Sequence, residues 1–108
     1  MSNDVLERLA ATIRARRSAA ATGSSYTRQL LDAGPIGCAK KLGEEAIETV
    51  IAGAGESEDK LRQEAADLLY HLLVLLESRG VSLEDVLSVL EQRSGTSGLE
   101  EKAGRTQR

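Results

Sequence analysis

The chain has 108 residues, 17 of them acidic and 14 basic, and a formal net charge of −3 at pH 7. This length corresponds to one domain, and the slight negative charge gives no overall basic field for nucleic acid or anionic lipid. Aromatic residues make up 2% of the chain, which excludes large stacking platforms for single-stranded nucleic acid. A single Cys and a single His exclude a disulfide framework and a Cys-rich zinc site, whereas the carboxylates leave a hard-metal oxygen site open.

The apolar stretches indicate a cytoplasmic protein. The first residues contain no apolar run after a basic stretch, so we do not expect a signal peptide. The longest apolar stretch, residues 68–76, is about half the length that a membrane-spanning helix needs. We therefore expect a soluble protein in the cytoplasm.

Helical periodicity dominates the N-terminal part of the chain. Apolar residues recur at intervals of three and four from Val5 to Ile13, which predicts an amphipathic helix. The small and polar residues 18–25 predict a loop. A short helix is expected from 26 to 33, ended by the Gly34-Pro35 pair.

A longer helix is predicted from 36 to about 52. Its apolar residues, including Ile47 and Val50, fall on one side at 3.6 residues per turn. Its acidic residues fall on the opposite side. Gly53 and Gly55 are expected to break this helix.

The next helix is predicted from 58 to about 79, with Ser57 as its cap and Gly80 as its end. Residues 68–76 are apolar nearly all round the helix, which is typical of a segment buried on several sides. In a chain this small, that pattern favours a partner subunit. Ser82 is expected to begin a final helix.

These elements predict an all-α fold in which four to five helices form a bundle that dimerisation completes. We expect one helical domain over residues 1–93. Residues 94–108 form a Gly-rich, basic tail, expected to be a loop or a mobile segment without ligand.

Two acidic sets on consecutive helices are the most informative residues. The first set contains Glu44, Glu45 and Glu48, and the second contains Glu64 and Asp67. Residues three apart share a helix face, so an antiparallel hairpin would let the two sets face each other.

Carboxylates crowded in this way repel one another and need protons or cations. Mg²⁺ takes oxygen ligands and keeps positions open for water and phosphate oxygens, so the pattern suits a magnesium-dependent phosphate enzyme. The alternative is an ordinary solvated surface, on which Glu and Asp are common.

Basic and hydroxyl residues surround the acids in the sequence, and their side chains suit a phosphate-rich ligand. Taken singly, each is equally consistent with a solubilising surface. The candidates for substrate binding are Ser25, Tyr26, Thr27, Lys41, His71, Arg93, Lys102 and Arg105.

His71 follows Asp67 by one helical turn. It is either a half-buried histidine hydrogen-bonded to a carboxylate or a residue that contacts substrate. Tyr70 is expected to pack with its hydroxyl satisfied. Cys38 is expected to be a small core residue rather than a nucleophile.

Four segments resemble the phosphoribosyl-ATP pyrophosphohydrolase family, which belongs to the MazG-like, all-α nucleoside-triphosphate pyrophosphohydrolases. The EExxE and ExxD spacing of Glu44, Glu45, Glu48, Glu64 and Asp67 is the metal motif of the wider superfamily. The other segments resemble the histidine-biosynthesis branch. The segments are SYTRQLL (25–31), KKLGEEAIE (40–48), EAADLLYHLLVLL (64–76) and RSGTSGLEEKAGR (93–105).

The resemblance implies a helical dimer and Mg²⁺-dependent hydrolysis of phosphoribosyl-ATP between its α and β phosphates, giving phosphoribosyl-AMP and pyrophosphate. It implies that Glu44 is a further metal ligand or the group that activates water, and that Lys41 meets the triphosphate. Ser25, Tyr26, Thr27 and His71 would line the substrate site. The implied metal ligands are Glu45, Glu48, Glu64 and Asp67, and Glu44 and Glu45 are the candidate catalytic residues.

The family often carries His where this chain has Ser94, so that position is not expected to be essential. In many organisms this activity is fused to the phosphoribosyl-AMP cyclohydrolase, which uses Cys-rich zinc chemistry. One Cys and one His cannot supply that chemistry, so the resemblance implies a separate cyclohydrolase.

Two other functions fit parts of the pattern. A house-cleaning pyrophosphohydrolase acting on dUTP, dCTP or damaged nucleotides would use the same acids, and substrate preference would distinguish it. A non-catalytic dimerisation or adaptor module would explain the apolar helix but predicts no Mg²⁺ binding.

Overall fold

The computed structural model describes residues 4–18 and 25–95. The described residues form helices and connecting turns without a strand, which confirms the all-α prediction. The five helices are α1 (Asp4–Arg17), α2 (Tyr26–Asp32), α3 (Gly34–Gly55), α4 (Glu58–Ser78) and α5 (Leu83–Gly95). None of these helices is long and apolar enough to cross a membrane.

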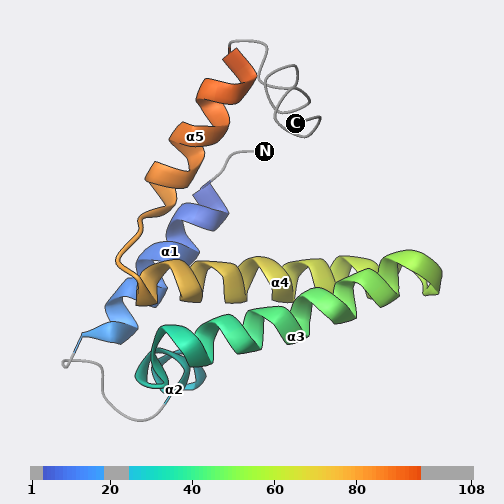
Figure 1. The fold of residues 1–108 in the computed structure, drawn as a ribbon, viewed down its shortest axis with the longest axis horizontal. Helices are drawn as coiled ribbons and strands as arrows, with labels where there is room; N and C mark the ends of the chain where they lie inside the picture. Colours follow the sequence, from blue (N-terminus) through green and yellow to red (C-terminus); the bar gives the residue numbers. More distant parts are fainter. Residues whose placement is uncertain (1–3, 19–24, 96–108) are drawn as a thin grey trace, which may run out of the picture.

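The helices α3 and α4 lie side by side as a long antiparallel hairpin (Figure 1). Both α1 and α2 pack at the end of the hairpin where α3 begins and α4 ends. From that same end α5 extends away from the hairpin (Figure 1). The hairpin is therefore the scaffold that carries both acidic sets.

Most of the predicted helix ends are confirmed by their caps. The hydroxyl of Ser57 accepts a hydrogen bond from the Lys60 N–H, and the hydroxyl of Ser82 accepts one from the Asp85 N–H. Gly80 follows α4 with a φ of 72°, a left-handed conformation that glycine adopts without strain.

The predicted limits of α3 were wrong at both ends. The helix begins at Gly34, whose φ of 80° reverses the chain after α2, and Pro35 then occupies the first turn, where a missing N–H costs nothing. The helix also continues through Gly53 and Gly55. At Gly53, packing of α3 on α4, where this glycine faces Leu61, offsets a propensity cost of about 1 kcal/mol. Gly55 is the last residue of the helix.

The core lies where α1, α3, α4 and the start of α5 meet. Its fully buried members include Ile13, Cys38 and Val74. The thiol of Cys38 donates to the carbonyl oxygen of Leu30, 3.1 Å away, which fits the predicted core role. Arg17 pairs with Glu77 at 3.0 Å and thereby ties α1 to α4.

The apolar side of α3 faces away from this core. Ile36, Ile47 and Val50 are 86%, 63% and 68% exposed, whereas the side toward α4 carries Glu45 and Ala52. The hairpin thus buries the acidic side of α3 and leaves its apolar side uncovered within the chain. On α4, Leu69 is also exposed.

Candidate active site

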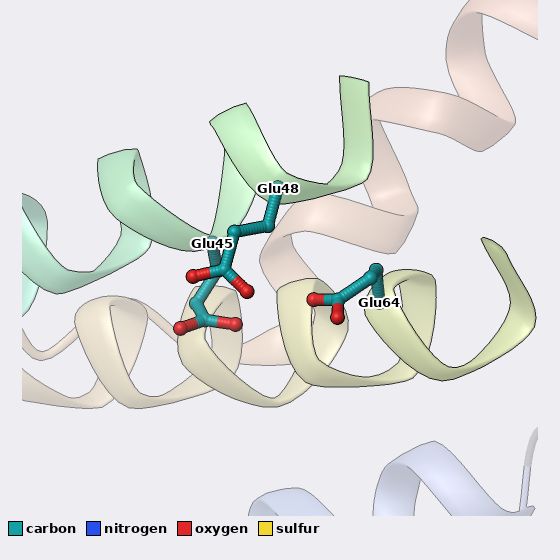
Figure 2. Close-up of side chains that lie close together, drawn as sticks. All are labelled: Glu45, Glu48 and Glu64. Carbon is teal, nitrogen blue, oxygen red and sulfur yellow. The ribbon is translucent and has the colours of Figure 1, made fainter. Parts of the chain in front are cut away.

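Three of the predicted metal ligands meet inside the hairpin. One carboxylate oxygen from each of Glu45, Glu48 and Glu64 lies within 4.8 Å of the other two. Figure 2 shows Glu45 and Glu48 extending from α3 toward Glu64 on α4. The antiparallel packing therefore brings two acids of the first set face to face with Glu64 of the second set.

Two of these acids are buried. Glu45 is 7% exposed and Glu64 is 5% exposed, whereas Glu48 lies at the open side of the group. The Oε2 atom of Glu64 pairs with the Lys60 ammonium at 3.1 Å, but its Oε1 atom is buried without a hydrogen-bond partner. A buried, unpaired carboxylate oxygen is costly, and a cation would satisfy it.

The electrostatics of the group also favour a cation. Repulsion from Glu45, and then from Glu64, raises the pKa of Glu48 above its ordinary value. The hydrogen bond from the Lys60 ammonium to Glu64 raises the pKa of that lysine. Lys60 beside Glu64 and Lys41 beside Glu45 offset only part of the charge of three carboxylates.

Asp67 and Glu44 lie outside this group of three. Asp67 follows Glu64 by one turn on α4, and both Asp67 and Glu44 are exposed. The ammonium of Lys41 lies 3.6 Å from a Glu44 oxygen and 3.7 Å from a Glu45 oxygen. Lys41 therefore pairs with both Glu44 and Glu45 at the edge of the acid group.

Lys41 also connects the acids to an aromatic cluster. The electrostatic interaction with Tyr26 is the largest cause raising the pKa of Lys41, and Glu44 and Glu45 add to it. Tyr26, Tyr70 and His71 contact one another, with the Tyr70 and His71 ring centres 4.9 Å apart.

His71 is held at both ring nitrogens. Its Nδ1 lies 2.8 Å from the carbonyl oxygen of Asp67, and its Nε2 lies 3.1 Å from the Tyr26 hydroxyl. A carbonyl can only accept, so Nδ1 donates and, in the neutral ring, Nε2 accepts from Tyr26. The expected half-buried histidine paired with a carboxylate was therefore wrong: His71 is 6% exposed and its partner on α4 is the backbone.

The hydroxyls of Ser25 and Thr27 each have a hydrogen-bond partner within the chain. Ser25 caps α2 by accepting from the Arg28 N–H. Thr27 shares a short hydrogen bond with the Tyr70 hydroxyl, which confirms the prediction that this tyrosine packs with its hydroxyl satisfied.

The basic residues near the end of the chain are not brought to the acids. Arg93 lies on α5, which points away from the hairpin (Figure 1). Lys102 and Arg105, and most of the predicted tail, lie outside the described residues, although α5 includes Ser94 and Gly95.

The sequence analysis did not single out Lys60 or Thr49. Lys60 precedes Glu64 by four residues, a spacing that by itself predicts an ion pair. Thr49 follows Glu45 by four residues, and its hydroxyl donates to the Glu45 carbonyl. Its contact with α4 depends on the helix pairing and has no local signal.

The sequence that forms this hairpin has relatives among known proteins. Residues 6–94 match the family model of phosphoribosyl-ATP pyrophosphohydrolase. This chain belongs to that family. The match covers all of the described site residues, including the three clustered acids.

Relatives of the family support the same conclusion over nearly the full length. Phosphoribosyl-ATP pyrophosphatase of Cereibacter sphaeroides (strain KD131) is 54% identical over 101 residues, which cover 94% of this chain and 97% of that protein. Phosphoribosyl-ATP pyrophosphatase 1 of Rhodopseudomonas palustris (strain CGA009) is 55% identical over 105 residues, covering 97% of each chain. The corresponding protein of Bradyrhizobium diazoefficiens is 58% identical over 97 residues, covering 90% and 91%.

Proposed function

We propose that this chain hydrolyses phosphoribosyl-ATP with Mg²⁺ bound at Glu45, Glu48, Glu64 and Asp67. The products are phosphoribosyl-AMP and pyrophosphate, and the reaction is the second step of histidine biosynthesis. The observation that carries the proposal is the group of three carboxylates with a buried, unpaired Glu64 oxygen in a member of this family.

The donor set fits Mg²⁺ by its chemistry. Carboxylate oxygens are hard ligands, and the group combines two buried acids with one at the open side. Asp67 lies one turn after Glu64 on the same helix, outside the group of three, and is the proposed fourth ligand. When bound, Mg²⁺ would supply charge neutralisation for the phosphates and the leaving pyrophosphate.

The chain's own residues divide the remaining work. Water attacks the α-phosphorus, the bond to the bridging oxygen breaks, and its electron pair leaves with pyrophosphate. We assign the proton of that water to the carboxylate of Glu44 or Glu45. Lys41, beside both acids, is placed to meet the triphosphate.

The aromatic cluster suits the rest of the substrate. Tyr26 is half exposed beside the buried His71, so its ring and hydroxyl remain available to a ligand next to Lys41. We assign Tyr26, Thr27 and His71 to the substrate site, with Ser25 at its edge. Arg93, Lys102 and Arg105 remain candidate phosphate contacts.

A second copy of this chain is the proposed partner. The exposed apolar side of α3, with Ile36, Ile47 and Val50, is what a helical dimer would cover. We further expect a cytoplasmic enzyme whose product passes to a separate phosphoribosyl-AMP cyclohydrolase.

A substrate comparison tests the proposed reaction. Pyrophosphate release is measured from phosphoribosyl-ATP, dUTP and dCTP, each with Mg²⁺ and with a chelator. We expect release from phosphoribosyl-ATP that requires Mg²⁺. Release from the deoxynucleotides alone would agree with the carboxylate site but contradict phosphoribosyl-ATP as the substrate. Release from none of the three nucleotides would favour a non-catalytic helical module.

A further inference from the structure

The hydroxyl of Thr49 joins the two helices at the level of the acids. Its Oγ1 lies 2.9 Å from the carbonyl oxygen of Glu45 on α3 and 3.1 Å from the carbonyl oxygen of Glu64 on α4. Both carbonyls can only accept, so the single hydrogen of the Thr49 hydroxyl is shared between them in a three-centre hydrogen bond. One side chain thus links the backbones of the two buried acids.

This link lies where carboxylates on the two helices of the hairpin repel one another. The carboxylates of Glu45, Glu48 and Glu64 crowd within 4.8 Å, and their mutual repulsion pushes α3 and α4 apart. A shift of one helix by one residue moves its side chains by about 1.5 Å along the axis. Mg²⁺ demands near-ideal ligand geometry, so a shift of that size would disrupt the site.

The contacts on the next turn of the hairpin do little to fix how far α3 can shift along α4. The next turn of α3 presents Ala52 and Gly53, and the space beside Gly53 is bounded by the flexible end of Leu61. Small residues allow close approach of the helices but do not fix their sliding position. A directional hydrogen bond, such as the one from Thr49 to the Glu64 carbonyl, fixes that position.

We propose that Thr49 is a positioning residue for the metal site, holding the Glu45 and Glu64 backbones in the register that lets their carboxylates bind one ion. The inference rests on the proposed Mg²⁺ site. It assigns Thr49 no contact with the substrate or the ion.

Three variants test this role by calorimetric titration of the full-length, metal-free protein with MgCl₂. Thr49→Val keeps the shape and removes the donor, whereas Thr49→Ser keeps the donor. We expect Thr49→Val to weaken Mg²⁺ binding about tenfold, the magnitude typical of groups that orient metal ligands. Thr49→Ser should bind within about twofold of the original protein. If Thr49→Val lowers the helical content, Thr49→Ala also removes the hydroxyl, and Ala has the highest helix propensity.

Ser78→Ala is the matched control. The Ser78 hydroxyl also donates to a carbonyl, that of Leu75, but on its own helix and away from the acids. Its loss should leave Mg²⁺ affinity unchanged. Equal Mg²⁺ affinity in the original protein, Thr49→Val and Thr49→Ala would overturn the positioning role alone. Failure of the original protein to bind Mg²⁺ would instead overturn the proposed function on which it rests.

Discussion

Glu48 is the acid whose protonation the structure perturbs most clearly. Glu45 first, and then Glu64, raise its pKa above the ordinary 4.5. The folded chain therefore holds this proton more tightly than the unfolded chain does, and ionising Glu48 lowers stability. Without metal, the free energy of unfolding should fall as the pH rises from the ordinary pKa through the raised one.

Glu48→Gln should remove this pH dependence. Denaturant unfolding in a chelating buffer from about pH 4 to pH 7 measures it. We expect the original protein to lose stability relative to Glu48→Gln over that range. Glu91→Gln, an exposed acid on α5, should follow the original protein. Parallel curves for all three proteins would contradict the repulsion described for the acid group.

Tyr26 links the predicted substrate residues to the fold through His71. Tyr26→Phe removes the donor to the buried Nε2 of that histidine, which should cost about 1 kcal/mol of unfolding free energy. If the Tyr26 hydroxyl also contacts substrate, the KM for phosphoribosyl-ATP should rise several-fold with a smaller change in kcat. Steady-state kinetics beside thermal unfolding separates the two effects, and an unchanged KM would remove the hydroxyl from the substrate site.

Among the helices, α4 depends on its start for the placement of Glu64. Ser57 caps the helix through the Lys60 N–H, and the Lys60 ammonium in turn pairs with Glu64. Ser57→Ala should therefore lower the unfolding free energy by about 1 kcal/mol, whereas Ser57→Asp should retain the cap. Thermal unfolding checks this, and an unchanged unfolding free energy in Ser57→Ala would show that the cap contributes nothing.

Local signals in the sequence account for the helix order and most caps. Ser57, Gly80 and Ser82 act through contacts within a few residues, so their roles are predictable from the sequence. The continuation of α3 past Gly53 is not predictable from the sequence, because packing on α4 outweighs the weak helix propensity of that glycine.

In the site, too, some features are predictable from the sequence and others depend on how the helices pack. The spacing of the acids predicts that the pair Glu45 and Glu48 faces the pair Glu64 and Asp67. The structure brings three of these acids together and leaves Asp67 outside the group. The partner of His71 could not be predicted, because nothing in the sequence distinguishes the Asp67 carbonyl from its carboxylate. The bridge from Thr49 to α4 depends on the register between helices, which periodicity alone does not fix.

The whole molecule leaves an apolar side uncovered. Ile47 and Val50 are exposed on α3, opposite the acids that face α4. Ile47→Glu should therefore convert a dimer, with twice the chain's 11.5 kDa, into a monomer. Thr12→Glu, which places the same charge on the exposed side of α1, should leave the mass unchanged. Sedimentation equilibrium measures this, and a monomeric original protein would contradict the proposed dimer.

The Mg²⁺ dependence of pyrophosphate release from phosphoribosyl-ATP tests the central claim most directly when the original protein, Glu64→Gln and Glu91→Gln are compared. Glu64 is the buried acid with an unpaired oxygen, so its loss should reduce Mg²⁺-dependent release by about a hundredfold or more while helical content is retained. Glu91→Gln should match the original protein. Release by Glu64→Gln at the original rate and the original Mg²⁺ concentration would contradict a metal site built on these carboxylates.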